Sequence, residues 1–197
     1  MFSLIGSLHD KVFGGIQRGL ENWFLGLFAR LVFAAVLFMY FFNSAKTKIG
    51  EGALGFLTIT DNAYFQILPS VVEQYGFDVS QVPTFPYKLI VMAGTYGEII
   101  LPILIVIGLL TRIAAIGMIA FVLVQSYVDI AFHAADETTI GAWFDRLSDS
   151  VILDQRALWV FLFVYLVIRG AGVISLDYLF YGRKAANHST RYASMVA

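Results

Sequence analysis

The 197-residue chain is 59% hydrophobic and 14% charged, with a net charge of −1 and a mean hydropathy of +0.77. Soluble domains are roughly 45–50% apolar and about 25% charged, so this composition excludes a water-soluble enzyme and a disordered chain. The near-zero net charge leaves no basic surface for a nucleic acid, and the lack of cysteine excludes disulfide relays and iron–sulfur clusters. We therefore expect an all-α integral membrane protein with the lipid bilayer as its solvent.

Residues 1–22 predict an amphipathic helix ahead of the first membrane span. One helical stripe carries the apolar side chains Phe2, Ile5, Leu8, Val12, Phe13, Ile16 and Leu20. Such a helix is expected to lie on the membrane surface. No small-residue cleavage pattern accompanies it, so we expect the segment to be retained rather than removed as a signal peptide.

Four apolar stretches are long enough to cross a hydrocarbon layer of about 30 Å, which needs roughly 20 helical residues. They are Trp23–Phe42, Tyr87–Leu110, Ile113–Phe132 and Ala157–Ile174. The sequence therefore predicts a four-helix transmembrane bundle over residues 23–180, followed by a tail at residues 181–197.

Basic residues predict the orientation of the bundle. One end carries Lys11, Arg18, Arg112, Arg183, Lys184 and Arg191. The opposite end has two long connections, residues 43–86 and 133–156, in which aromatic side chains indicate lids at the membrane interface. Because basic residues favour the cytoplasmic side, we expect a multi-pass protein of the inner cell membrane with both termini in the cytoplasm.

Charged side chains inside the predicted spans are the strongest functional signal. Each such residue costs roughly 2.5–3.5 kcal/mol on insertion scales unless it is paired or hydrated. At about 1.5 Å per helical residue, Glu98 lies roughly 15 Å below the outer surface, and Arg30 and Arg169 both lie roughly 20 Å deep. The sequence therefore predicts Glu98 held between the two arginines near the midplane.

The third span adds a polar face. Gln125, Asp129 and His133 recur at a spacing of four, which places them on one side of a helix. Asp129 is expected to face a hydrated outer cavity, with no basic partner nearer than His133. With Glu98, these residues predict a polar ladder from the outer surface to the midplane.

Two interpretations of the ladder remain open. In the first, Glu98, Asp129 and His133 are the catalytic residues that relay protons. A cofactor-binding set then holds the carbonyl oxygens of a quinone, and it consists of Arg30, Glu98, Gln125 and Arg169. In the second, the charged residues only lock the helices together.

Metal and haem sites are not expected. Asp129 and His133 offer only two metal ligands, with Asp136 and Glu137 as extras, which is a weak signal. His9 and His188 are predicted on the opposite side of the membrane from His133, so a haem with two histidine ligands within one chain is disfavoured.

Several of these residues carry a resemblance. The stretch GTYGEIILPILIVIGLLTRIAAIGMIA at residues 94–120 resembles the signature of the DoxX family of small four-helix membrane proteins, and RGAGVISLDYLF at residues 169–180 is similar to the closing pattern of that family. Arg30 followed by Leu31 also fits. The resemblance covers residues 25–180.

The resemblance implies a bacterial or archaeal inner-membrane protein. Relatives are described as subunits of a thiosulfate:quinone oxidoreductase, or as membrane partners of redox and stress-response enzymes. Two functions follow as hypotheses: a quinone-interacting subunit of a redox complex, and a non-catalytic membrane anchor or assembly subunit. Both imply other protein subunits or further copies of the chain as partners. A transporter is disfavoured, because four helices enclose little volume.

Overall fold

Helices form all the regular structure of residues 2–182, the part of the chain that the computed structural model describes. Three of them, Thr84–Ile107, Thr111–Ala131 and Val151–Arg169, are long and apolar enough to cross a membrane, and the pair Gly6–Leu20 and Phe24–Val36, bent by 63°, makes a fourth if it is counted as one span. The predicted all-α class is therefore confirmed for the described residues. The tail predicted at 181–197 lies outside them apart from its first two residues.

The first predicted span is a broken helix. It consists of α2 (Phe24–Val36) and α3 (Phe38–Lys46), which are separated at Leu37, where φ is −111°. The Leu37 N–H still donates to the Phe33 carbonyl at 2.8 Å, so the helical path continues across the break. The predicted end at residue 42 was therefore too early, because the next four residues form the last turn of α3.

The second and third predicted spans are confirmed as α6 (Leu89–Ile107) and α7 (Thr111–Ala131). A tight turn joins them, in which Gly108 has φ +69° and Leu110 has φ +50°. Glycine adopts such left-handed values without the steric clash of a Cβ atom, so Gly108 ends α6.

The fourth predicted span is shifted toward the N-terminus, because the helical run Val151–Arg169 begins six residues before the predicted start at Ala157. Helix α9 (Arg156–Arg169) ends five residues before the predicted boundary at Ile174. Gly170, with φ +76°, closes the helix and turns the chain away. Arg169 therefore lies at a helix end rather than deep within a span.

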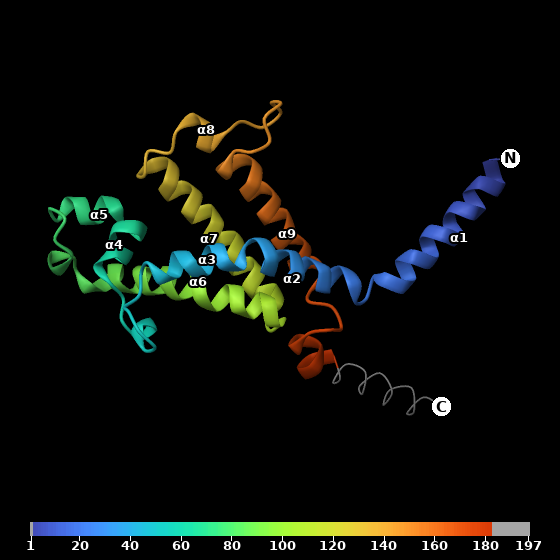
Figure 1. The fold of residues 1–197 in the computed structure, drawn as a ribbon, viewed down its shortest axis with the longest axis horizontal. Coiled ribbons are helices and arrows are strands. Elements are labelled where there is room, and N and C mark those ends of the chain that lie inside the picture. The colour runs from blue at the N-terminus through green and yellow to red at the C-terminus, as the bar shows by residue number, and fades with distance from the viewer. Residues whose placement is uncertain (1, 183–197) are drawn as a thin grey trace.

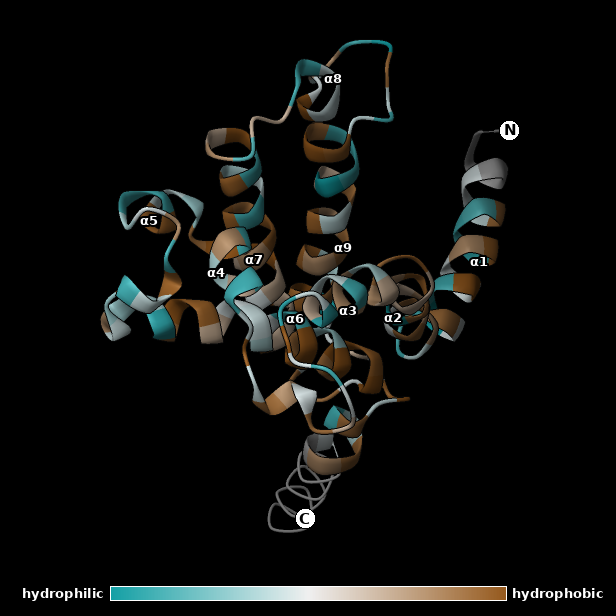
Figure 2. Cartoon of the chain, turned by 60° about the vertical axis from the view of Figure 1, so that its left-hand side comes forward, coloured by the Kyte–Doolittle hydropathy of each residue, from teal (hydrophilic) through white to brown (hydrophobic). Residues whose placement is uncertain are grey.

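The long helices form two antiparallel pairs that cross each other. The α2–α3 run lies beside α6, and α7 lies beside α9 at a marked inclination to the first pair (Figure 1). Large buried side chains fill the crossing, chiefly Phe33, Phe41, Met118, Phe163 and Leu166. Outside this core, apolar residues dominate the outer surfaces of the long helices (Figure 2), as expected for a protein surrounded by lipid.

The predicted N-terminal helix is present as α1 (Phe2–Leu20), and it extends away from the helix pairs (Figure 1). Its residues 6–20 make an angle of 63° with α2. The exposed side chains include Leu8, Val12, Phe13 and Ile16. Their exposure leaves an apolar stripe without a partner in the described chain.

The two long connections, residues 43–86 (the first outer connection) and 133–156 (the second outer connection), contain short helices. The first holds α4 (Asp61–Ile67) and α5 (Pro69–Gln74), and α4 packs against α6. The second holds α8 (Glu137–Ile140), whose first turn is capped by Asp136. Helix α4 brings polar side chains next to the buried Glu98, as described below.

Candidate functional site

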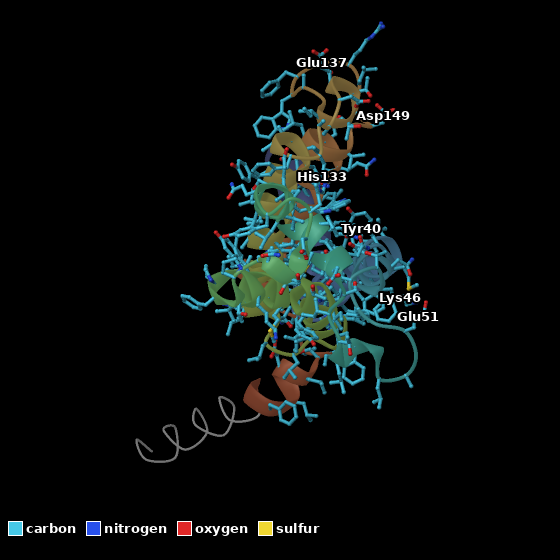
Figure 3. The ribbon with its side chains drawn as sticks, turned by 90° about the vertical axis from the view of Figure 1, so that its left-hand side faces the viewer. Tyr40, Lys46, Glu51, His133, Glu137 and Asp149 are labelled. Atoms are coloured by element: carbon cyan, nitrogen blue, oxygen red, sulfur yellow. The ribbon has the colours of Figure 1, made fainter. Side chains whose placement is uncertain are left out.

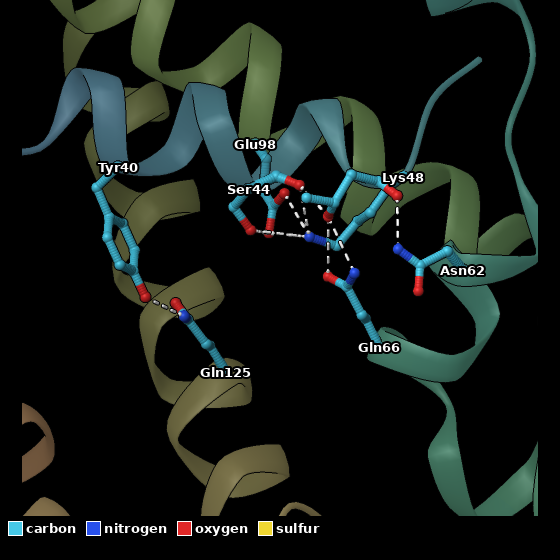
Figure 4. A network of polar contacts seen from close by, with 8 residues as sticks. Tyr40, Ser44, Lys48, Asn62, Gln66, Glu98 and Gln125 are labelled. Atoms are coloured by element: carbon cyan, nitrogen blue, oxygen red, sulfur yellow. Dashed lines mark hydrogen bonds and ion pairs between the residues drawn. The ribbon is translucent and has the colours of Figure 1, made fainter. Parts of the chain in front are cut away.

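Glu98 is buried on α6 and forms an ion pair with Lys48. The Lys48 Nζ atom lies 2.9 Å from Oε2 and 3.2 Å from Oε1 of Glu98, and both side chains are almost fully buried. Ser44, on α3, accepts a hydrogen bond from Nζ at 2.8 Å and donates one to Glu98 Oε1 at 3.3 Å (Figure 4). The buried carboxylate therefore has its counter-charge just beyond α3.

The chain around Lys48 is held in place by α4. The Asn62 amide donates to the Thr47 carbonyl at 2.7 Å, and the Gln66 amide donates to Thr47 Oγ1 at 2.9 Å (Figure 4). The Thr60 N–H donates to the Lys48 carbonyl at 3.0 Å. These contacts fix the backbone on both sides of the Lys48 side chain and direct its ammonium group toward Glu98.

The predicted cluster of Glu98 with Arg30 and Arg169 is wrong. The Arg30 guanidinium instead donates to four backbone carbonyls: those of Ile105 at 3.0 Å, Val106 at 2.6 Å, Ile174 at 2.6 Å and Ala171 at 3.4 Å. Carbonyls at the end of a helix lack their usual helical partners; here the guanidinium satisfies that of Val106 and adds a second donor to that of Ile105, which also accepts from the Gly108 N–H at 3.1 Å. Counting residues gave the depth of Arg30 along its helix but not the direction of its side chain.

Arg169 is exposed at the end of α9 and lines a surface basin with Arg112 and Gly170. Because Gly170 ends the helix, Arg169 is level with the α6–α7 turn. The prediction placed the end of the span five residues later, at Ile174. It therefore placed Arg169 too far from the end of the bundle at which α9 ends.

The predicted polar face of α7 is present, and each of its residues has a specific partner. Gln125 donates to the Tyr40 hydroxyl at 2.7 Å (Figure 4). Asp129 accepts from Arg156 at 2.6 Å, and Nδ1 of His133 lies 3.4 Å from the other oxygen of Asp129. The expectation that Asp129 has no basic partner nearer than His133 is therefore wrong, because the buried Arg156 side chain reaches it from α9.

A groove between α3, α4, α6 and α7 connects these polar groups. Its volume is about 580 Å³, and its lining includes Lys48, Glu98, Gln125, Asp129 and His133. Most of the remaining lining is apolar or small, with Ile67, Ile90, Ala93, Gly94, Gly97, Leu101, Gly117, Ala120, Phe121, Val124 and Val128. The groove therefore combines an apolar wall with polar groups at several points along its length, and we call it the polar-lined groove.

The groove contains one buried polar atom without a partner. Oε1 of Gln125 makes no hydrogen bond with any described residue, although the amide nitrogen of the same side chain is paired with Tyr40. Buried polar atoms are rarely left unpaired in folded proteins. A hydrogen-bonding ligand in the groove is one way in which this side chain could be satisfied.

No three or more acidic or histidine side chains converge on a possible metal site within residues 2–182. Asp136 is engaged in capping α8, and hydrogen bonds from Thr139 and then Thr138 hold the pKa of its carboxyl below its usual range. In Figure 3, Glu137 lies well beyond His133, toward the tip of the molecule. His188 lies outside the described residues.

Other residues that carry the family resemblance meet where α6 ends, at Gly108. The two carboxylate oxygens of Asp177 accept from the N–H groups of Leu110 and Thr111 at 2.6 and 2.9 Å, and the Asp177 N–H donates to the Gly108 carbonyl at 2.7 Å. A Cβ atom on Gly108 would lie 2.7 Å from the Cβ of Ser175 and 2.8 Å from Cζ of Arg30. We call Arg30, Gly108, Ser175 and Asp177 the end cluster; it ties α2, α6 and α7 to the chain after α9.

Comparison with protein-family models, with curated proteins and with solved structures found no match to this chain.

Two residues of the site, Lys48 and Arg156, were missed by the sequence analysis. Both lie at the ends of predicted spans, where lysine and arginine are common anchors at a membrane surface, so they were assigned to the outer connections. A signal for Lys48 was present, because Ser44 and Lys48 are four residues apart and would share a helical face if the helix of the first span continued for six more residues, to residue 48.

Proposed function

We propose that this chain is a DoxX-like membrane subunit of a redox complex that binds a quinone in the polar-lined groove. The observation that carries the proposal is the placement of Glu98, Gln125, Asp129 and His133 along one groove with an apolar wall. A quinone has an apolar ring and tail with two carbonyl oxygens, so it requires this combination of surfaces.

The dimensions of the groove support the proposal. Small-molecule sites are typically about 300–1,000 Å³ and mostly apolar, with a few polar groups that fix the orientation of the ligand. The groove volume of about 580 Å³ falls within this range. The exposed side chain of Val124 lies at its edge, so a ligand could enter from the surrounding lipid.

The polar groups suggest how a quinone would be held. A flip of the Gln125 amide would let its Oε1 accept from the Tyr40 hydroxyl and would turn its N–H groups into the groove, where they would donate to one carbonyl oxygen of the quinone. The Lys48 ammonium group would strengthen a hydrogen bond to the second oxygen, because donors that carry charge bind more strongly than neutral ones. Reduction to the quinol takes up two electrons and two protons, and the electrons would come from a partner redox subunit.

The groups near the outer end of the groove suggest a proton route. His133 is partly exposed and contacts Asp129, which lies on the groove and is paired with Arg156. Histidine can gain and lose a proton near neutral pH. We therefore place proton entry at His133 and transfer through Asp129 toward the bound ring.

Binding of a short-chain quinone to the purified full chain tests the proposal. Ala120 is an exposed residue of the groove wall, and Ala120→Phe should fill the groove without touching any ion pair. We expect decylubiquinone or a soluble menaquinone analogue to raise the melting temperature of the wild-type protein in detergent. Ala120→Phe should abolish this increase.

Ala35→Phe is the matched control, because Ala35 is an exposed helical alanine on α2 that does not line the groove. It should bind the quinone as the wild-type protein does. Absence of quinone binding to the wild-type chain, or equal binding by the two variants, would exclude the groove as a quinone site.

A second candidate function, a non-catalytic anchor or assembly subunit, is supported by the second outer connection. Trp143, Phe144 and Leu147 are strongly exposed there, and Phe144 is held with φ +66°. Large exposed apolar groups at a protein surface are typical of contact sites for other proteins or for membranes. If this function is correct, Phe144→Ser should release a co-purifying subunit while quinone binding stays absent in every variant.

A further inference from the structure

A second basin lies at the end of the bundle that is remote from the polar-lined groove. Its volume is about 480 Å³, and it is formed where α7 begins and α9 ends. The basic side chains of Arg112 and Arg169 line it, and neither forms an ion pair with any described residue. We call it the arginine basin.

The two arginines are brought together by the left-handed turn at Gly170. A Cβ atom at Gly170 would lie only 3.4 Å from Nε of Arg112, so the guanidinium group of Arg112 lies directly against the residue that follows Arg169. Both arginines line the same basin although they come from different helices. Arginine is suited to phosphate, because its planar group can donate two parallel hydrogen bonds to phosphate oxygens.

Two further observations support an anionic ligand. Thr111 lines the basin, and its buried hydroxyl makes no hydrogen bond with any described residue. Asp177 is the carboxylate in the lining, and its two oxygens already accept hydrogen bonds from backbone N–H groups of Leu110 and Thr111. The positive charge of the arginines therefore exceeds the negative charge of the basin, and a buried hydroxyl remains free to donate.

The surface next to the basin is apolar. Ile113 and Ile116 follow Arg112 along α7 and are exposed, and the exposed Ile168 precedes Arg169 on α9. A ligand whose phosphate contacts the arginines could therefore lay apolar tails along both helices. Basic pockets between membrane helices bind the headgroups of anionic lipids in the same manner.

From these contacts we propose that the arginine basin binds the phosphate group of an anionic phospholipid. The proposal does not depend on quinone binding, because the basin and the groove lie at opposite ends of α7 and share no lining residue. The headgroup would hold this end of the bundle at the membrane surface.

The test uses the purified full chain in neutral detergent and three probes: dihexanoyl phosphatidylglycerol, dihexanoyl phosphatidylcholine and inorganic phosphate. Binding is measured by native mass spectrometry and by the shift in melting temperature. We expect phosphatidylglycerol to bind more tightly than the other two probes. Replacing one arginine, as in Arg112→Gln or Arg169→Gln, should weaken that binding about tenfold, and replacing both should weaken it about a hundredfold.

Arg146→Gln is the matched control, because Arg146 is an exposed arginine on the second outer connection, far from the basin. It should leave the affinity unchanged. The double variant Arg112→Lys with Arg169→Lys keeps both charges and should retain more affinity than the double glutamine variant, which separates charge from folding.

Equal binding of phosphatidylglycerol and phosphatidylcholine would overturn the proposal, as would full affinity in the double glutamine variant. If inorganic phosphate binds as tightly as phosphatidylglycerol, the site takes a soluble anion and the assignment to a lipid is wrong. If the lysine variant binds no better than the glutamine variant, the arginines do not act through their charge and the proposal also fails.

Discussion

The middle and the end of α6 hold buried charges in different ways. In the end cluster, Arg30 donates to four backbone carbonyls and Asp177 accepts from two backbone N–H groups. In the polar-lined groove, Lys48 and Glu98 are held mainly by each other and by Ser44. Main-chain partners are fixed by the helices that carry them, whereas side-chain partners can rotate. The end cluster is therefore suited to joining helices, and the groove is suited to exchanging partners with a ligand.

The largest expected effect is from Arg30→Met. This change removes the guanidinium group, which donates to the Val106, Ala171 and Ile174 carbonyls and is the second donor to Ile105; each carbonyl left without a donor costs about 1–3 kcal/mol. We expect the free energy of unfolding to fall by more than for any variant in the groove. Thermal unfolding in detergent measures the loss, and Arg30→Lys should recover part of it. A melting temperature equal to that of the wild-type protein would show that the end cluster does not hold the helices together.

Next in size is the effect of breaking the ion pair in the groove. Lys48→Met or Glu98→Gln alone leaves one uncompensated buried charge, and each should lower the free energy of unfolding by about 3–5 kcal/mol. The double variant removes both charges and should be more stable than either single variant. Chemical denaturation of all four proteins gives the coupling energy between the two residues. Additive losses would mean that the pair does not interact.

A smaller effect is expected at the outer end of the groove. Asp129→Asn leaves the buried Arg156 without its counter-charge, although Ser126 still accepts a hydrogen bond from Arg156 at 2.9 Å, so the loss should be about 1.5–3 kcal/mol. His133→Gln should change stability by less than about 0.5 kcal/mol, because His133 is partly exposed.

If the proton route is correct, quinone-linked turnover of the purified complex should fall in His133→Gln while its melting temperature remains that of the wild-type protein. Full turnover in that variant would exclude His133 from proton transfer.

A last comparison pairs two glycines of α6 and its turn, one with a moderate expected effect and one with almost none. At Gly108, alanine would require a left-handed φ and would contact Ser175 and Arg30 too closely, so Gly108→Ala should lower stability by about 1–3 kcal/mol. At Gly97, in the groove, a Cβ atom would meet its nearest neighbours at 3.9 Å, and alanine is favoured over glycine in a helix by roughly 0.5–1 kcal/mol. Gly97→Ala should therefore be neutral or slightly stabilising. Equal losses at both positions would mean that neither the turn nor the end cluster constrains Gly108.

Much of the candidate site was predictable from periodicity. Gln125 and Asp129 share one face of α7, and His133, two residues beyond the end of that helix, lines the same groove with them and with Glu98. The partners of these residues were not predictable. Tyr40 and Arg156 come from helices that are distant in the sequence, and the crossing of the helix pairs determines which side chains meet.

The sequence by itself determined that the chain is helical and apolar, where α6 and α7 lie, and that Arg30 and Glu98 carry buried charge. These properties depend on composition, on a repeat of 3.6 residues and on the conformational freedom of glycine, all of which are local. Only the tertiary structure decided that Glu98 pairs with Lys48 and that Arg30 binds backbone carbonyls. The depth of a residue in a span gives its level but not its direction, and a buried charge pairs with whichever group the packing of the helices brings within about 3 Å.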